Sequence, residues 1–371
     1  MEVYLVGGAL RDLLLGRMPV ELDYAFSGSA EAFLAAHPEA VRVGKSVSVC
    51  LWRGRECMPL RGGSIPADLQ ARDLTVNAMA LGSDGKLHMH PRAVEDLRNN
   101  MLRPASPSSF MDDPARVFRL ARFAALRPDW RIHRSAFEQM RAVGRKALGA
   151  LPPERVGREL LKALPSPAPG RFFRVLGQGN CLEPWFVELE RARHVPAGPA
   201  RWHKNSVFGH SLRLMDELAG DDVAVWMALC HDLGKILTDP ALLPHHYGHE
   251  KTGAPLANRL VSRLRLPTAL AGAGVLAAEA HMKAGMYKKL RVGTRRDLLW
   301  RVHCTGLSEP FWKLADADSA SSVSATALEE LAVIRKVTLP QAWRDRGEQS
   351  ARRLRELQCA ALADHARTTG P

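Results

Sequence analysis

The first 28 residues place a glycine pair and two acidic residues among strand-like and helical runs. An apolar run leads into Gly7-Gly8, and leucines at helical spacing follow. After a turn, a strand-like run over residues 20–26 carries Glu21 and Asp23. Glycines before a helix bring backbone N–H groups to a phosphate, and side chains two apart in a strand share a face. The stretch therefore predicts a phosphate-handling site with a two-carboxylate metal centre. A plain tight turn and a solvated strand face are the alternatives.

Length and composition indicate the broad class of the chain. Its 371 residues suggest two to four domains, with 46% hydrophobic and 25% charged residues, as in soluble globular proteins. No apolar run reaches the roughly 18 residues of a membrane span, and no secretory leader is visible. Six scattered cysteines without a CxxC pair predict reduced thiols. We therefore expect a cytoplasmic protein without membrane contact.

The net charge of +13 predicts a polyanionic partner. Residues 115–147 concentrate this charge, since they hold nine Lys and Arg against two acids. Basic helices of this kind suit contacts with a nucleic-acid backbone. An arginine-rich solvated surface is the alternative interpretation.

Residues 30–91 alternate between strand, turn and helix signals. Period-two runs at residues 41–60 predict a small sheet, in which Glu56 is a candidate third carboxylate. A flexible connection is expected at residues 61–66 and a helix over 68–81. A DG turn within residues 81–91 then predicts two short paired strands.

A helical region is predicted over residues 104–128. Asp112 and Asp113 lie in its expected first turn, four and three residues before Arg116. On one helix face these side chains form a plate of hydrogen-bond acceptors and donors, which suits the reading of a base edge. An ordinary surface ion pair is the alternative.

The second half of the chain carries helix signals and clustered histidines. A helix is predicted at residues 151–164, a Pro- and Gly-rich linker at 196–201, and a basic helical tail at 326–371. Four of the polar residues on the intervening helices have the types and order of a metal site: His210, His231, Asp232 and Asp318. Neutral imidazoles and carboxylates that hold a metal suit phosphate-ester hydrolysis.

The motifs LVGGALRDLLLG, ELD, ARDLTVNAMAL, DDPARVFRLARFAA and PPERVGRELLKAL occur in this order, followed by the His and Asp set. In this the sequence resembles the bacterial class II tRNA nucleotidyltransferases, the CCA-adding enzymes, with an appended HD domain. The resemblance implies an α+β fold, with a small β-sheet palm followed by all-α domains. It implies four domains: a palm at 1–105, a helical nucleotide- and tRNA-binding domain at 106–200, an HD domain at 205–325 and a basic tail at 326–371.

The resemblance also implies residue roles. Glu21 and Asp23 match the catalytic pair that binds Mg²⁺. Nucleotide binding falls on a set of glycine, arginine, asparagine and acidic positions: Gly8, Arg11, Arg72, Asp73, Asn77, Asp112, Asp113, Arg116, Arg119 and Arg155. The HD positions match the divalent-metal set of a phosphohydrolase, for which Ni²⁺, Mn²⁺ and Mg²⁺ are candidates. The implied partners are tRNA, CTP and ATP, with monomer and homodimer both open.

Three departures from the family pattern leave two alternatives open. Glu21 stands where the family has Asp, Asp112 stands where it has Glu, and only GGSIPADLQA remains of a long flexible loop. One alternative is a paralogue with a weakened polymerase site and a working HD phosphohydrolase. A non-catalytic RNA-binding protein is the other, which the retained carboxylates and the complete HD set argue against.

Overall fold

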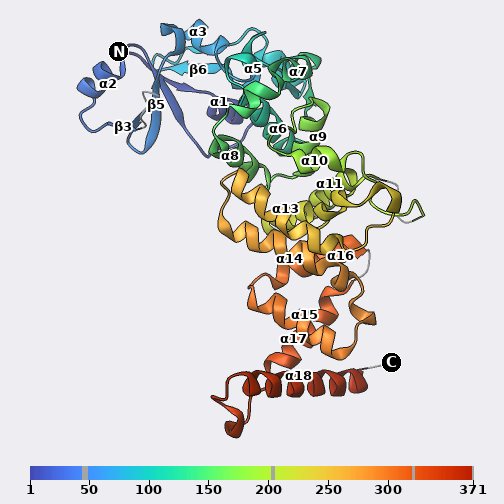
Figure 1. Ribbon diagram of the computed structural model, residues 1–371. Helices are drawn as coiled ribbons and strands as arrows, with labels where there is room; N and C mark the ends of the chain where they lie inside the picture. Colours follow the sequence, from blue (N-terminus) through green and yellow to red (C-terminus); the bar gives the residue numbers. More distant parts are fainter. Residues whose placement is uncertain (44–48, 202–204, 320–321, 370–371) are drawn as a thin grey trace. The chain divides into compact units, whose positions relative to one another are not determined.

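The computed structural model describes residues 1–43, 49–201, 205–319 and 322–369, which form two compact units (Figure 1). The first unit comprises residues 1–151 and 175–184, and the second comprises 152–174 and 185–371. Every β-strand of these described residues lies in the first unit, and the second is helical. The expected α+β fold is confirmed, while the finer division into four domains stays a prediction.

A seven-stranded sheet in the order β3-β4-β5-β2-β1-β6-β7 forms the N-terminal part of the first unit. Its strands are β1 (Val3–Val6), β2 (Asp23–Phe26), β3 (Val41–Val43), β4 (Val49–Trp52), β5 (Arg55–Pro59), β6 (Met79–Gly82) and β7 (Leu87–Met89). β2 pairs antiparallel with β1 and parallel with β5, where Tyr24 lies opposite Cys57. The expected strands over residues 41–60 are confirmed, except that Gly44, Val47 and Ser48 lie outside the described residues.

Short helices surround this sheet and extend the first unit: α1 (Gly8–Leu14), α2 (Ala30–Ala36), α3 (Ile65–Gln70), α4 (Ala93–Arg98), α5 (Ser109–Asp112), α6 (Arg116–Leu126) and α7 (Arg134–Gly149). A two-stranded sheet pairs β8 (Met101–Leu102) with β9 (Arg131–Ile132). α2 covers one sheet face, where the Phe33 ring stacks on Phe26 at 4.1 Å between centroids. Tyr4, Val6 and Ala80 belong to a second buried cluster.

Three sequence predictions near the sheet differ from the structure. β2 begins only at Asp23, so Glu21 precedes the strand and is exposed. Residues 68–81 are not one helix, because α3 ends at Gln70 and a 3₁₀ turn, η2 (Thr75–Asn77), leads into β6. Residues 73–80 are all buried. Their apolar side chains, which predicted one face of a helix, are equally consistent with a segment that is enclosed on all sides. The expected flexible connection at residues 61–66 forms a 3₁₀ turn and the start of α3.

The predicted helix over Asp112 and Arg116 is also interrupted. α5 ends at Asp112, Asp113 has an extended backbone (φ −144°, ψ 97°), and α6 begins at Arg116. Pro114 explains the break, because the proline ring disfavours helical dihedrals in the residue before it. The acidic residues and Arg116 therefore do not share one helix.

The second unit is built from α8 (Pro153–Ala163), the first part of α9 (Gly170–Gln178), α10 (Val187–Ala192), α11 (Val207–Glu217), α12 (Asp222–Cys230), α13 (His249–Arg263), α14 (Thr268–Gly285), α15 (Val292–Cys304), α16 (Ser308–Ser319), α17 (Ser324–Arg335) and α18 (Glu348–Thr369). Apolar on all sides and fully buried from Ala224 to Cys230, α12 packs against α11, α14 and α16. A 3₁₀ turn, η3 (Leu233–Leu237), follows it.

Gly234 in η3 permits a close approach between backbones. A Cβ atom at this position would lie 1.9 Å from the carbonyl oxygen of His249. Only glycine therefore lets the end of α12 meet the start of α13. Residues 196–201, predicted as a linker, lie inside this second unit instead.

In the described part of the chain, no helix combines the length and apolarity that crossing a membrane requires. All six cysteines are free thiols, as the sequence predicted.

Candidate functional site

Three carboxylates gather where β2 begins. Asp23 is the first residue of β2, Glu21 lies two residues earlier, and Glu56 lies in the parallel strand β5. Partial burial and the charges of Glu56 and Glu21 raise the pKa of Asp23. Carboxylates gathered in one place fit a divalent cation with oxygen ligands. The structure thus gives Glu56 the position expected of a third carboxylate.

Two arginines place positive charge near the same carboxylates. The charges of Arg72 and Arg119 act on Asp23 in the opposite direction, by lowering its pKa. Arg72 is held by Asp68, whose Oδ2 accepts hydrogen bonds from Nε (2.9 Å) and Nη2 (2.7 Å). Gly7, at φ +78°, precedes α1, and a Cβ there would lie 3.0 Å from Arg72 Nη1. The backbone conformation therefore favours glycine, and any larger residue would also displace the neighbouring guanidinium by a few tenths of an ångström.

A buried hydrogen-bond network fixes Arg119. Its Nε donates to Asp73 Oδ2 (2.8 Å), Asn77 Nδ2 donates to Asp73 Oδ1 (3.1 Å), and Arg11 Nη1 donates to Asn77 Oδ1 (2.7 Å). Burial alone would raise the pKa of Asp73, but the Arg119 charge and the hydrogen bonds hold it well below its usual value. Asp73 is therefore a permanent carboxylate that orients Arg119 and the amide of Asn77.

Among the described residues, Asp112 and Arg116 form no ion pair or hydrogen bond, although their spacing predicted a contact. Asp112 is exposed and accepts a hydrogen bond from Ser108 Oγ (2.9 Å). Arg116 is buried and its Nη1 donates to the carbonyl oxygens of Arg72 (3.2 Å) and Ser109 (3.1 Å). Asp113 lies nearer, with its Oδ2 4.0 Å from Arg116 Nε. Arg116 thus ties α6 to the Arg72 turn.

Two further residues with a predicted nucleotide-binding role lie at helix starts. Gly8 is the first residue of α1, directly after Gly7. Arg155 is exposed in the first turn of α8, in the second unit. Their roles stay predictions.

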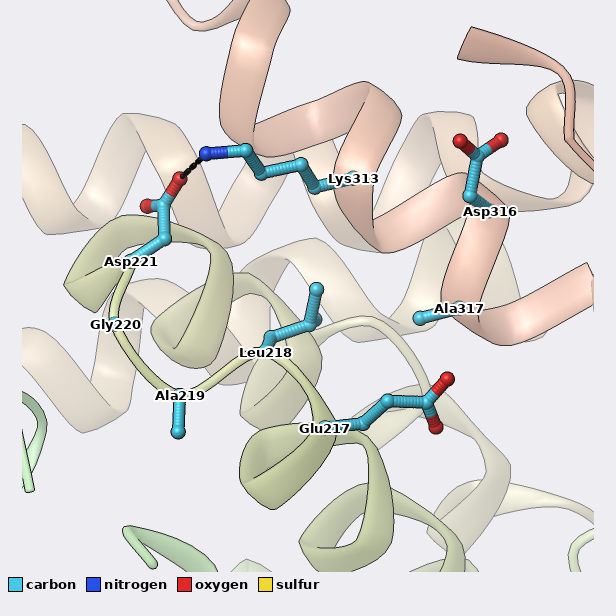
Figure 2. Close-up of a pocket in the computed structure, with 8 residues that line it drawn as sticks. All are labelled: Glu217, Leu218, Ala219, Gly220, Asp221, Lys313, Asp316 and Ala317. Atoms are coloured by element: carbon cyan, nitrogen blue, oxygen red, sulfur yellow. Dashed lines mark hydrogen bonds and ion pairs between the residues drawn. The ribbon is translucent and has the colours of Figure 1, made fainter. Parts of the chain in front are cut away.

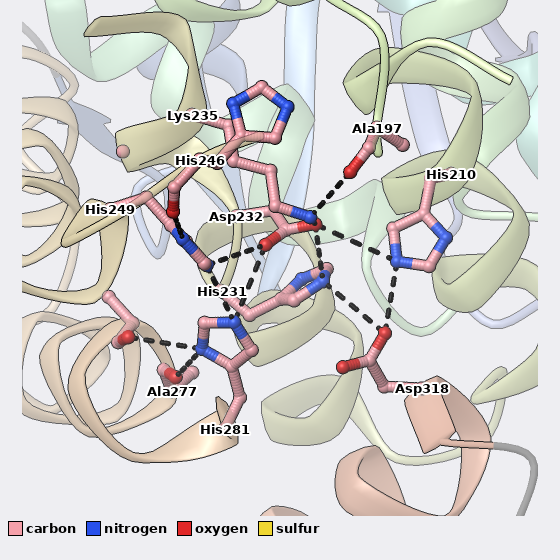
Figure 3. A network of polar contacts seen from close by, with 12 residues as sticks. Ala197, His210, His231, Asp232, Lys235, His246, His249, Ala277, His281 and Asp318 are labelled. Atoms are coloured by element: carbon pink, nitrogen blue, oxygen red, sulfur yellow. Dashed lines mark hydrogen bonds and ion pairs between the residues drawn. The ribbon is translucent and has the colours of Figure 1, made fainter. Parts of the chain in front are cut away.

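In the second unit, α11, the end of α12 and α16 bring the predicted His and Asp residues together (Figure 3). His210 Nε2 from α11 lies 3.0 Å from Asp318 Oδ1 of α16 and 3.7 Å from Asp232 Oδ2. His231 Nε2, at the end of α12, lies 3.2 Å from Asp232 Oδ2 and 3.7 Å from Asp318 Oδ1. The metal site predicted from residue order thus has its ligand atoms in one place.

The polar atoms of this cluster are buried and only partly satisfied. His231 and Asp232 are 0% and 1% exposed. Among the described residues, neither Asp232 oxygen nor His231 Nε2 has a hydrogen-bond partner of normal geometry. Burial opposes charge on Asp232, but His231 and Lys235 hold its pKa well below the usual range. Burial would lower the pKa of His231, and the charges of Asp232 and Asp318 raise it instead. Orphaned carboxylate and imidazole atoms fit a divalent metal.

Three residues of the cluster were not assigned a role from the sequence. Lys235 Nζ lies 2.7 Å from Asp232 Oδ2 and donates to the carbonyl oxygen of Ala197 (2.8 Å), within the segment predicted as a linker. His249 and His281 each place Nε2 3.4 Å from Asp232 Oδ1. In the sequence, each histidine lies four residues from a small residue, Gly253 for His249 and Ala277 for His281, and this helical spacing was the only signal available.

A hollow of about 550 Å³ lies elsewhere in the second unit, between the α11–α12 turn and α16 (Figure 2). Its charged side chains serve the fold. Lys313 Nζ pairs with Asp221 Oδ2 at 2.9 Å, and Asp316 Oδ1 accepts hydrogen bonds from the N–H groups of Val323 and Ser324. This hollow contains none of the predicted site residues.

Comparison with known proteins identifies the family. No model of a protein family matches the chain. It is 36% identical to the multifunctional CCA protein of Nitrosococcus oceani, covering 89% of this chain and 86% of that protein. The chain is 33% identical to the multifunctional CCA protein of Pasteurella multocida, and the alignment covers 89% of this chain and 86% of that protein.

Solved structures share the fold at lower identity. The Bacillus stearothermophilus CCA-adding enzyme in complex with CTP has a TM-score of 0.64 at 18% identity, covering 98% of this chain and 89% of that one. The Thermotoga maritima CCA-adding enzyme complexed with tRNA has a TM-score of 0.61 at 19% identity, with coverage of 98% and 87%. With one third of its residues shared with these relatives over most of its length, the chain belongs to the family of multifunctional CCA proteins, the CCA-adding tRNA nucleotidyltransferases.

Proposed function

We propose that the chain is a template-independent nucleotidyltransferase that adds C and A residues to tRNA 3′ ends from CTP and ATP. The strongest support is the cluster of three carboxylates, from Glu21, Asp23 and Glu56, which lies near the positive charges of Arg72 and Arg119. Acids on one side and guanidinium groups on the other suit a metal–triphosphate substrate.

In this proposal Glu21 and Asp23 hold Mg²⁺, with Glu56 beside them. When bound, Mg²⁺ neutralises charge on the triphosphate and on the attacking 3′ oxygen. Arg119, oriented by Asp73, binds phosphate oxygens, because a guanidinium presents paired donors to them. Asp113 supplies acceptor groups for the base edge, and the buried Arg116, whose Nε lies 4.0 Å from Asp113 Oδ2, supports it.

The proposed partners are supported by structures of CCA-adding enzymes and by the net charge of this chain. Structures of CCA-adding enzymes in complex with tRNA, CTP and ATP support these three partners for a chain of the same fold. The net charge of +13 supports a polyanionic substrate. A tRNA-processing role suits a cytoplasmic location.

A tRNA extension assay tests this function. Labelled tRNA that lacks its CCA end is incubated with Mg²⁺ and with CTP, ATP or both. We expect incorporation by the natural chain and a loss of at least about 100-fold in Asp23→Asn, because an amide cannot replace a charged Mg²⁺ ligand. Asp84→Asn, an exposed aspartate in the β6–β7 turn, is the matched control. The absence of incorporation at any enzyme concentration would exclude the proposal.

We also propose a second activity, metal-dependent hydrolysis of phosphate esters such as 2′,3′-cyclic phosphates, in the HD cluster. The buried, orphaned atoms of His231 and Asp232 support it, together with the convergence of His210 and Asp318. Nickel, manganese or magnesium is the expected metal, and imidazole ligands favour the first. Asp232→Asn should abolish hydrolysis and leave nucleotide incorporation intact. Hydrolysis that survived this change would contradict the assignment.

A further inference from the structure

We propose that Arg127, the residue that directly follows α6, is a positioning residue for the nucleotidyltransferase site. It holds Asp12 at one end of a chain of hydrogen bonds whose other end is Arg119. The inference rests on the proposed function, in which Arg119 binds phosphate oxygens. Arg127 itself lies outside the motif DDPARVFRLARFAA, which ends at Ala125.

The chain of hydrogen bonds begins at Asp12 in α1. Asp12 Oδ1 accepts from Arg127 Nη2 (3.4 Å) and from Nε (3.0 Å) and Nη2 (2.9 Å) of Arg11. Arg11 Nη1 donates in turn to Asn77 Oδ1 (2.7 Å). A second buried carboxylate then connects Asn77 to Arg119. One oxygen of Asp12 therefore joins the end of α6 to α1, and Arg11 joins α1 to η2.

Both ends of this chain lie on one face of α6. Arg119, Phe123 and Arg127 are spaced four residues apart, and the Arg127 N–H still donates to the carbonyl oxygen of Phe123 (2.9 Å), as in a helix. The Phe123 ring is buried between the two arginines, with its centroid 5.2 Å from the guanidinium carbon of Arg11. The helix and the hydrogen bonds together form a closed ring, so a change at one arginine of α6 reaches the other.

Arg11 determines how the Asn77 amide is oriented. Only a donor can face Asn77 Oδ1, so the guanidinium of Arg11 holds the oxygen side of the amide and leaves its NH₂ side for Asp73. Asp12 pairs with the other N–H groups of Arg11, but it is the next residue on the same helix and moves with it. Arg127 is distant in the sequence and lies on another helix, so it fixes this pair relative to α6.

Burial distinguishes this contact from an ordinary surface ion pair. The exposed fraction of the side chain is 13% for Arg127, 21% for Asp12 and 8% for Arg11. Water and salt screen such a pair less than an exposed one. Without Arg127, Asp12 still pairs with Arg11, so no buried charge is left without a partner. We therefore expect a substitution of Arg127 to change the orientation of the network while the first unit stays folded.

Nucleotide incorporation by Arg127→Gln tests the inference in the full-length chain. CTP is assayed on tRNA that lacks its CCA end, and ATP on tRNA that lacks only the terminal A. We expect kcat/KM to fall at least about threefold for both nucleotides, because a displaced guanidinium binds their shared phosphates less well. The KM for tRNA should stay unchanged. Arg127→Lys should restore part of the activity, because it keeps a charged donor for Asp12.

Arg92→Gln is the matched control, because it also removes an ion pair between an arginine and a carboxylate in the first unit. Arg92 Nη1 lies 2.8 Å from Glu95 Oε2, and its side chain is 57% exposed. This variant should retain the activity of the natural chain. Thermal unfolding shows whether each variant is folded. If Arg127→Gln does not fold, Arg127→Lys takes its place, with a smaller loss expected.

A double-mutant cycle separates a positioning role from a general loss of structure. In the Arg119→Gln background, Arg127→Gln should have little further effect on kcat/KM, because its effect passes through Arg119. A full additional loss in that background overturns the inference, and so does natural activity in the folded Arg127→Gln variant.

The NMR signal of the Arg119 side chain tests the same point without any activity measurement. In a chain labelled with ¹⁵N-arginine, the Arg119 Nε–H signal is assigned by its absence from Arg119→Gln. It should shift or exchange faster with water in Arg127→Gln, and stay unchanged in Arg92→Gln. A changed signal in a chain that incorporates no nucleotide would support the positioning role and exclude the polymerase function. An unchanged signal in a chain that incorporates nucleotides would do the reverse.

Discussion

The Asp73→Asn substitution tests whether a buried carboxylate positions Arg119 for the phosphates of the substrate. Asp73 Oδ2 accepts from Arg119 Nε (2.8 Å), whereas Oδ1 accepts from the Leu74 N–H (2.8 Å) and Asn77 Nδ2 (3.1 Å). Asparagine has the same shape and keeps the Oδ1 contacts. It turns an amide NH₂ toward the Arg119 donor, so the variant loses one charged hydrogen bond and the charge that balances Arg119.

The size of the effect follows from burial. A hydrogen bond to a charged group contributes about 1.5–3 kcal/mol. The Arg119 side chain is 42% exposed and that of Asp73 is 8% exposed. Solvent screens the pair on the arginine side, which reduces the loss in free energy of unfolding to about 1–2 kcal/mol. If the same contact orients Arg119 in the transition state, kcat/KM for CTP incorporation falls about tenfold, since about 1.4 kcal/mol corresponds to a factor of ten.

The pH dependence of this difference has a defined sign. The pKa of Asp73 is depressed in the folded chain, so its contribution is fully present above the ordinary carboxyl value of about 3.9. It is lost as the pH falls below that value toward the folded pKa. The difference in unfolding free energy between the natural chain and Asp73→Asn should therefore be constant from about pH 5 to 8 and shrink in more acidic solution.

Hydrogen exchange of peptides from residues 68–126 measures the change in the first unit alone, and tRNA extension measures kcat/KM. Asp84→Asn is again the matched control. A double-mutant cycle with Arg119→Gln isolates the pairwise effect. If the two substitutions act additively on kcat/KM, Asp73 does not work through Arg119 and the reasoning is refuted.

Two further substitutions probe Glu21, which departs from the family pattern, and Gly234, which permits a close contact between two backbone segments. Glu21→Asp should change the initial rate of CTP incorporation by less than about tenfold, because Glu21 precedes β2 in an exposed segment where its longer side chain has room to adjust. A much larger gain in rate would indicate that the natural glutamate is a poor metal ligand. That result would favour the paralogue with a weakened polymerase site. Gly234→Ala should lower the free energy of unfolding of the second unit, because its Cβ would meet the His249 carbonyl at 1.9 Å. Gly272→Ala in α14 has no atom within 4 Å and should leave this free energy nearly unchanged. Equal unfolding free energies in the two glycine variants, measured by denaturant unfolding, would contradict the role of this contact.

The sequence predicted the parts of the fold where one signal dominates. The strand, glycine turn and helix at residues 3–14 were found because local periodicity and glycine agree there. Around residues 68–81 the signals conflict, since side chains on every side of the segment are buried and polar Asp73 and Asn77 are satisfied by distant partners. Periodicity cannot indicate helix or strand for a segment that has no solvent-facing side.

The predicted contact between Asp112 and Arg116 is wrong because sequence spacing was taken as contact. Asp112 and Arg116 are four residues apart, which means proximity only in an unbroken helix, and Pro114 prevents that. The opposite error concerns His249 and His281, which are 32 residues apart and meet only because α13 packs along α14. Whether such residues meet depends on tertiary packing, which spacing within one element does not indicate.

A buried aspartate organises each of the two sites, and burial accounts for its importance. Removing a carboxylate from water opposes its charge, so a buried aspartate stays ionised only with cationic or hydrogen-bonding neighbours. Asp73 has Arg119 and two further donors, which account for both of its oxygens. Asp232 has Lys235 on one oxygen and four histidine nitrogens around the pair, yet lacks normal hydrogen bonds within the described chain. This difference separates the positioning role that we propose for Asp73 from the metal-binding role that we propose for Asp232. It also explains why metal analysis is the decisive measurement for Asp232 and a double-mutant cycle for Asp73.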